Sequence, residues 1–426
     1  MKFGMLYEHQ LPRPWTETSE QDLFNEALAQ VELADRIGID CVWAVEHHFL
    51  EEYCHSSAPE IFLAACAART KRIHLGHGIT LTPPPFNHPA RIAERIATLD
   101  LVSGGRVEFG TGESGSLMEL GGFNVPVDEK KDMWREGVEQ VTNMMVMDPY
   151  PGFEGKYFSM PCRNVVPKPV QKPHPPLWVA CSKRETILWA ARHGMGALAF
   201  SFADPGEATQ WVSDYYETFK TECVPIGHAV NPNIAVVSGF SCHEDADEAM
   251  RRGLDGFRFF AYALGHFYIY GEHQPGRTDV WQRFEQARDK MPTTKGASTI
   301  GTPDQLRESL SIYADAGVDQ VIFIQQGGRN EHEHICESLQ LFADKVMPQF
   351  KENEAERERQ KAEELAPYIE AAMARKQGME PLADKDIPVY PALGKEIVEQ
   401  RLAGRDKIVD GDRGNLAVPL IDLADD

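Results

Sequence analysis

Strand-like and helix-like patterns alternate along the first 350 residues of the chain. Short apolar runs, typical of strands buried on both faces, occur at residues 2–7, 40–46, 73–81, 106–110, 177–180, 196–200, 234–240 and 318–324. Helical spacing of apolar residues occurs at 20–37, 59–69, 89–102, 130–147, 184–193, 205–222, 244–260, from 303, and at 331–346. Repeated β–α units imply right-handed crossovers and a parallel sheet. Eight of them predict an α/β fold of the closed (β/α)8, or TIM, barrel type.

Two excursions and a tail are added to this pattern. Residues 148–176 are rich in proline and predict a small hairpin, and residues 261–300 form a long excursion rich in aromatics. The barrel domain with both excursions spans 1–350. Residues 351–426 begin as a run of Glu, Arg and Lys and become rich in Pro, Gly and Asp from 377, which predicts a charged helix and an extended arm. The arm either packs across a partner subunit of a homo-oligomer or is partly disordered.

Composition narrows the class of function. The net charge of −22 argues against nucleic acid or an anionic membrane as a partner. No apolar stretch reaches the roughly 18 residues that a membrane span needs, and no signal peptide is visible, so we expect a cytoplasmic protein. The eight cysteines form no CxxC pair, which predicts reduced thiols rather than disulfides or a zinc cage.

The strand at 40–46 ends on two histidines that could carry chemistry. Catalytic groups of barrels lie where such strands end. Because successive side chains of a strand point to opposite faces, only one of His47 and His48 can face the barrel mouth, and Glu46 points the same way as His48. A histidine there can move protons or stabilise a developing anion. A purely structural histidine is the alternative.

Two glycine-rich segments follow. Gly76 and Gly78 flank His77, and glycines inside a strand let a flat ring approach the backbone, although a bulge would explain them equally. His77 is therefore either a ligand-facing group or a partly exposed strand residue. After the fourth strand, residues 110–116 contain three glycines, and the exposed N–H groups of such a loop could approach an anion.

A second anion-binding candidate opens the helix at 184–193. Ser182 is expected to cap this helix, whose N-terminus offers free N–H groups and partial positive charge beside Lys183 and Arg184. This combination predicts a phosphate site. The alternative is an ordinary capping box of Ser182 and Glu185.

Two other clusters lead to weaker predictions. The aromatics between Phe257 and Tyr270 either line an apolar substrate pocket or pack the excursion onto the barrel. The segment from His332 to Cys336 lacks the spacing of a metal-binding helix and is interpreted as a solvated helix start. We therefore predict no metal site.

Taken together, the motifs resemble those of the bacterial luciferase-like flavin-dependent monooxygenases. The resemblance runs in order over about residues 1–347. It rests on Met1 to Gly4, Gly38 to Phe49, His88 to Arg91, Leu99-Asp100 with Ser103 to Arg106, and residues 178–194. It implies an enzyme that uses reduced FMN (FMNH2) and O2, with a separate NAD(P)H:flavin reductase. A C4a-peroxyflavin would then oxygenate a small, mostly apolar organic substrate.

The resemblance also implies roles for residues. His47 matches the family's catalytic histidine, and we expect Glu46 and His77 to support it. Gly78-Ile79 matches a position where a non-proline cis peptide supports the isoalloxazine ring.

Ser182, with the backbone around Glu185 and Thr186, matches the family's binding site for the flavin phosphate. Residues 261–297 match a mobile loop that shields the site from water. One departure concerns the segment after the fourth strand. Luciferases carry a reactive cysteine and an arginine there, whereas this chain has Gly112 and Glu113, followed by Ser114. Lys183 or Arg184 can substitute for the missing arginine.

Three alternatives stay open at this point. A deazaflavin (F420)-dependent oxidoreductase would share the barrel. A metal-dependent barrel hydrolase needs His-x-His at the end of the first strand, where this chain has Tyr7-Glu8-His9. The third is a non-catalytic flavin-binding partner subunit.

Overall fold

The computed structural model describes residues 1–200, 205–291 and 299–393. The chain divides into a unit of Met1–Met379 and a unit of Glu380–Asp426. In the second unit the described residues contain one 3-10 turn, Asp384–Asp386. Most of the predicted arm, residues 394–426, lies outside the described residues.

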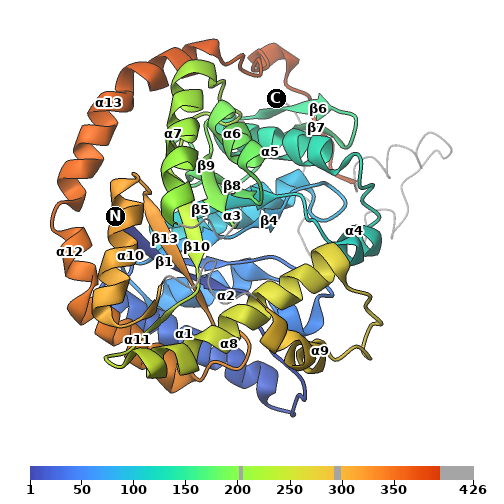
Figure 1. The fold of residues 1–426 in the computed structure, drawn as a ribbon. Coiled ribbons are helices and arrows are strands. Elements are labelled where there is room, and N and C mark those ends of the chain that lie inside the picture. Colours follow the sequence, from blue (N-terminus) through green and yellow to red (C-terminus); the bar gives the residue numbers. More distant parts are fainter. Residues whose placement is uncertain (201–204, 292–298, 394–426) are drawn as a thin grey trace. The chain divides into compact units, whose positions relative to one another are not determined.

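Eight parallel strands close into a barrel in the first unit (Figure 1). They are β1 (Lys2–Tyr7), β2 (Cys41–Ala44), β3 (His74–His77) with β4 (Thr80–Leu81), β5 (Val107–Gly112), β8 (Leu177–Cys181), β9 (Gly196–Ala199), β10 (Ile234–Ser238) and β13 (Gln320–Gln325). Strand β1 pairs with both β2 and β13, and β3 pairs with both β2 and β5, so the ring has no open edge. The predicted barrel is confirmed, with its third strand in two pieces.

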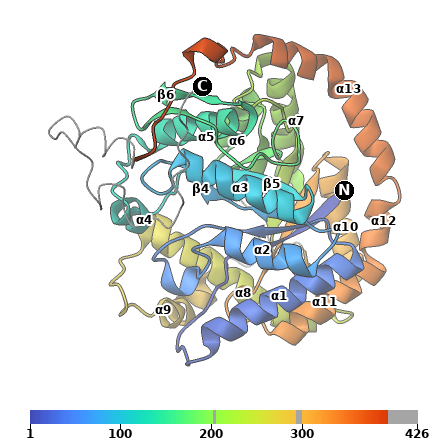
Figure 2. The ribbon, with the colours of Figure 1, turned by 180° about the vertical axis from the view of Figure 1, so that it is seen from behind.

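Helices surround the ring of strands. They are α1 (Ser19–Ile37), α2 (Pro59–Arg69), α3 (Pro89–Ser103), α5 (Lys130–Val146), α6 (Arg184–Arg192), α7 (Pro205–Glu222), α8 (Ala246–Gly265), α10 (Pro303–Asp315) and α11 (His332–Lys345). Helix α1 ends where Gly38 adopts a left-handed φ of 95° and its N–H donates to Ala34, a conformation that favours glycine. Figure 2 shows α1, α2 and α3 side by side on the outside of the barrel.

The two excursions differ in how closely they follow the sequence pattern. The first contains the predicted hairpin, β6 (Tyr150–Glu154) with β7 (Ser159–Arg163). In the second, α8 runs five residues further than predicted, because its apolar face stays buried against the barrel. It continues into a π-helix (His266–Tyr270), and α9 (Val280–Ala287) and a 3-10 turn (Arg288–Lys290) follow. Residues 292–298 lie outside the described residues.

Shorter elements complete the first unit. These are a 3-10 turn (Glu51–Tyr53), α4 (Leu117–Gly122), a parallel pair of β11 (Ser241–Cys242) and β12 (Ile300–Gly301), and α12 (Met347–Lys351).

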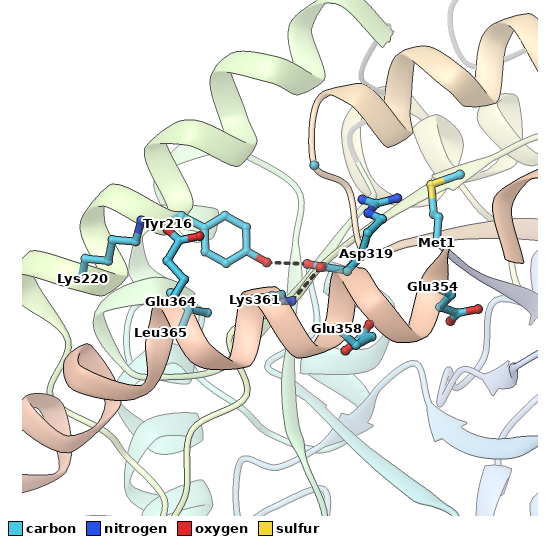
Figure 3. A pocket seen from close by; sticks show the side chains of 11 residues that line it. Met1, Tyr216, Lys220, Asp319, Glu354, Glu358, Lys361, Glu364 and Leu365 are labelled. Carbon is cyan, nitrogen blue, oxygen red and sulfur yellow. Dashed lines mark hydrogen bonds and ion pairs between the residues drawn. The ribbon is translucent and has the colours of Figure 1, made fainter. Parts of the chain in front are cut away.

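The charged segment after residue 350 forms α13 (Glu354–Arg375), which packs against α7. A hollow of about 270 Å³ lies where α13 meets α7, and Figure 3 shows the side chains that line it. Asp319 lies just before β13. Its carboxylate accepts hydrogen bonds from Lys361 Nζ at 2.6 Å and from the Tyr216 hydroxyl at 2.6 Å. Because the charges in this hollow pair with one another, we interpret it as a structural contact between helix and barrel.

Two tryptophans fill the barrel interior. The rings of Trp43 and Trp178 lie 5.4 Å apart and nearly perpendicular, and both side chains are buried. A Cβ at Gly76 would lie 2.3 Å from the Trp43 ring, and one at Gly196 would lie 2.3 Å from the Trp178 ring. Glycine is therefore required at both positions, because each indole occupies the space that a side chain there would fill.

Candidate active site

A cavity of about 460 Å³ opens at the carboxyl ends of the strands. Its lining residues lie in or just after β1, β2, β4, β5, β8 and β9, and come also from α5, α6, α8 and the π-helix. The apolar walls include Val45, Leu81, Val179, Phe260 and Leu264. Polar groups gather around His47 and at the start of α6. The cavity thus has two polar regions joined by apolar walls, an arrangement typical of small-molecule sites.

A carboxylate holds the imidazole of His47. The Nδ1 atom lies 3.0 Å from Oε1 of Glu119, which comes from the short helix α4. Glu119 also accepts hydrogen bonds from the His48 backbone N–H at 2.9 Å and from the Ser114 hydroxyl at 2.6 Å. The Tyr268 hydroxyl lies 3.3 Å from the same Nδ1. The ring of His47 is therefore fixed from two sides.

This contact shifts both pKa values. Burial by itself would lower the pKa of His47, but the charge and hydrogen bond of Glu119, with smaller contributions from Glu8 and Glu46, raise it to about 9. Burial by itself would raise the pKa of Glu119, but His47 and the hydrogen bonds from Ser114 and the backbone bring it below its ordinary value. Both shifts favour the charged forms of the two side chains, an imidazolium beside a carboxylate.

A second buried carboxylate, Glu8, lies on the other side of the ring. Its Oε2 is 3.8 Å from Nε2 of His47, and its Oε1 accepts a hydrogen bond from the Tyr53 hydroxyl at 3.1 Å. Within the described residues Oε2 has no hydrogen-bond partner. Burial raises the pKa of Glu8.

Glu46 and His48 lie together and away from the cavity lining, as the alternation of side chains predicts. The Nε2 of His48 is 3.2 Å from Glu46 Oε1. The other Glu46 oxygen accepts the Leu81 backbone N–H at 2.7 Å, and the Glu46 backbone N–H donates to Ile79 at 3.0 Å. Glu46 therefore stabilises the third strand, which is interrupted between β3 and β4, and does not line the cavity.

His77 is likewise outside the cavity. Gly76 faces the Trp43 ring inside the barrel, so its neighbour points to the helix layer. There burial lowers the pKa of His77 to about 4, with further effects from Glu60 on α2 and Arg95 on α3. The side chain is 1% exposed, so both predicted interpretations, ligand-facing and partly exposed, are wrong.

Gly78, Ile79 and Gly112 do line the cavity. The cis peptide bonds of the described residues all precede proline, so the expected cis bond between Gly78 and Ile79 is wrong. A trans bond is the ordinary state of such a peptide, since the cis form costs about 3 kcal/mol. A Cβ at Gly112 would lie 2.6 Å from the Ile79 side chain. Glycine at this position therefore leaves the space that Ile79 fills.

The other polar region is the start of α6. Ser182, Lys183, Glu185 and Thr186 line it, whereas Arg184 is outside the lining and pairs with Asp214. The expected capping by Ser182 is wrong. The N-cap residue is Lys183, whose carbonyl accepts the first helical hydrogen bonds, and no side chain of the described residues caps the helix.

Lysines from α5 add positive charge at the same end of the cavity. Lys131 lies with its Nζ 5.7 Å from the Trp189 ring centroid, and Lys130 lies 3.5 Å from Glu113 and donates to the Ser114 carbonyl. Both lysines line the cavity with Glu113 and Ser114. Lys183 and Lys131 therefore place positive charge near the start of α6, whereas Lys130 is paired with Glu113.

Sequence reasoning missed three residues around His47: Glu8, Tyr53 and Glu119. One signal was available for Glu8, which directly follows a buried strand. Both roles predicted for the aromatics between Phe257 and Tyr270 occur. Phe260 and Tyr268 line the cavity, whereas Phe257 and Phe259 are packed in the interior.

The fold and this site define an α/β-barrel enzyme with a cavity large enough for a cofactor. The sequence profile described as luciferase-like monooxygenase matches residues 1–320. The chain therefore belongs to the luciferase-like monooxygenases, a family of oxidoreductases.

Similar proteins include monooxygenases and F420-dependent enzymes. The oxygenase component of flavin-dependent trigonelline monooxygenase from Acinetobacter baylyi is 24% identical over 84% of this chain and 98% of that protein. F420-dependent glucose-6-phosphate dehydrogenase from Amycolatopsis mediterranei is 24% identical over 75% of this chain and 92% of that protein.

Two solved structures share the fold. Monooxygenase RslO1 from Streptomyces bottropensis has a TM-score of 0.67 at 28% identity and covers 82% of this chain and 100% of its own. The oxygenating constituent of 3,6-diketocamphane monooxygenase from Pseudomonas putida, in complex with FMN, has a TM-score of 0.63 at 20% identity, covering 82% and 98%.

The described residues contain no helix that is both long and apolar enough to cross a membrane. They also contain no group of three or more His, Cys, Asp or Glu side chains placed to hold a metal ion.

Proposed function

We propose that the protein is the oxygenase component of a two-component monooxygenase. It would use reduced FMN, delivered by a separate NAD(P)H:flavin reductase, and O2 to oxygenate a small, mostly apolar organic substrate. The observation that carries the proposal is the single cavity that joins His47 to the start of α6 through apolar walls. The flavin-dependent relative with a separate oxygenase component supports it.

The cavity fits the parts of a flavin mononucleotide. Val45, Ile79 and Leu81 provide an apolar wall for a flat ring. Lys183 and Thr186 lie at an uncapped helix N-terminus, where backbone N–H groups and the helix dipole favour a phosphate. When bound, reduced flavin supplies the electrons that activate O2.

The chain's own residues have three tasks in this proposal. The apolar walls keep water from the reacting groups. The start of α6 and its lysines orient the cofactor by its phosphate. His47 places an ionisable group at the ring end of the cavity, where negative charge develops during oxygen chemistry.

The decisive experiment measures oxygen and NADH consumption with FMN, a generic flavin reductase and a panel of apolar substrates. We expect substrate-dependent product formation, and a large loss of it in His47→Ala. If no substrate alters product formation or peroxide release, and His47→Ala changes nothing, the proposal fails.

The phosphate contact can be tested separately by fluorescence titration with FMN and with riboflavin. Lys183→Ala should weaken FMN binding about fivefold to tenfold, because a hydrogen bond to a charged group is lost, and should leave riboflavin binding unchanged. Arg184→Ala is the matched control, since Arg184 pairs with Asp214 outside the cavity lining. Equal effects of the two substitutions would contradict the assignment.

A deazaflavin-dependent oxidoreductase is the second candidate, favoured by the F420-dependent relative. Tight binding of F420 and its turnover without oxygen uptake would select it. A non-catalytic flavin-binding partner is the third candidate, which an inert protein that still binds FMN would select. Homo-oligomerisation through the C-terminal arm stays a prediction, and light scattering of the full chain tests it.

A further inference from the structure

Glu119 is built into the site as a charged group. Its side chain is completely buried, yet both carboxylate oxygens accept hydrogen bonds: Oε1 from the His48 backbone and Oε2 from Ser114. A carboxylate with such donors remains ionised despite burial. The short helix that carries it is fixed in turn, because Ser116 caps its start and Gly122 lies against the Phe49 ring.

An ionised carboxylate only accepts hydrogen bonds. The Nδ1 of His47, 3.0 Å from Glu119, must therefore carry a hydrogen. The other ring nitrogen, Nε2, faces Glu8 across 3.8 Å. That distance is too long for a hydrogen bond, so Glu8 acts on Nε2 only through its charge.

The remaining titratable groups around the ring do not oppose a positive charge. The Tyr268 hydroxyl from the π-helix lies 3.3 Å from Nδ1, the Tyr53 ring from the 3-10 turn lies 5.8 Å from the imidazole, and Glu46 contributes a third negative charge. The three carboxylates that act on His47 come from the segments after β1 and β2 and from α4, and each favours the protonated ring.

We propose that Glu119 is a positioning residue that holds His47 as an imidazolium, so that its Nε2–H is a hydrogen-bond donor into the cavity at neutral pH. The role in oxygenation rests on the proposed function, whereas the charge state of the ring does not. His47 would then stabilise negative charge that develops in the cavity, and would not act as a base that removes a proton. Charge-assisted donors of this kind are about twice as strong as neutral ones.

The test is a direct titration of His47 in the ligand-free protein. Carbon-13-labelled histidine gives ring signals that report protonation by NMR, and His47→Gln identifies the signal of this residue. We expect a midpoint near pH 9, as the geometry and the raised pKa indicate. In Glu119→Gln, which keeps the shape of the side chain and removes its charge, the midpoint should fall by about 1–3 pH units.

Two further variants separate positioning from simple structural support. Glu119→Asp keeps the charge and should restore most of the shift, whereas Ser114→Ala keeps the charge of Glu119 and should lower the midpoint less than Glu119→Gln does. A wild-type midpoint at or below about 6.5, or no movement in Glu119→Gln, would overturn the proposal. Failure of FMN binding or oxygenation would leave this titration unchanged, so the two proposals fail independently.

Discussion

Protonation of His47 links the stability of the fold to pH. Burial opposes the charge, but Glu119 raises the pKa of His47 to about 9, whereas the same side chain in the unfolded chain titrates near 6.5. A pKa that is higher in the folded state means that folding tightens proton binding. The stabilisation is therefore fully present below about pH 6.5 and is lost as the pH rises through about 9. A difference of about 2.5 pKa units corresponds to about 3 kcal/mol.

Urea denaturation of the wild type and His47→Gln, at about pH 6 and about pH 9.5, measures this contribution. Subtracting the free energy of unfolding of the variant from that of the wild type removes the contributions of groups that titrate in both proteins. The difference in free energy of unfolding should shrink by about 3 kcal/mol between the two pH values. A difference that is the same at both would refute the reasoning, because it would show that His47 carries the same charge in the folded and unfolded chains.

Two further predictions concern packing. In Gly76→Ala the new Cβ would lie 2.3 Å from the buried Trp43 ring, so urea denaturation should show a loss of about 1–3 kcal/mol. Gly121→Ala, where nothing lies within 4 Å, is the control, and equal stability of both variants would contradict the prediction. In Lys361→Met the half-buried Asp319 loses its cationic partner, which should cost about 1–3 kcal/mol and speed amide exchange in α13. Unchanged exchange would argue that other contacts hold this helix.

The barrel could be predicted because its signal is local. A strand buried on both faces needs a continuous apolar run, and helices that cover such strands need an apolar stripe, so eight repeats could be read directly. The six-residue helix α4 could not, because its sequence Leu-Met-Glu-Leu-Gly-Gly is too short for a periodic pattern and ends in two glycines. The extension of α8 depended on which surface its aromatics would cover, and that surface forms only in the folded barrel.

The candidate site also has features that the local sequence predicts and features that only the fold determines. Alternation along a strand placed His47 and His48 on opposite sides, and the same rule applied to Gly76 would have turned His77 away from the cavity. The cap of α6 was misplaced by one residue, because the helix begins after Lys183, a residue type that does not ordinarily cap a helix with its side chain. Glu119 was missed because its partner lies 72 positions away, and only the fold brings the two together.

The packing of Trp43 and Trp178 in the barrel interior has a consequence for how this enzyme can change its substrate. The two indoles occupy gaps left by Gly76 and Gly196, so a new residue at any of these positions requires a matching change at another. The cavity wall that contains Phe260 and Tyr268 is different, because these residues belong to α8 and the π-helix and form no part of the closed ring. Mutation can reshape that wall one residue at a time without loss of the barrel. New substrate ranges in evolution or directed selection should therefore arise first through α8.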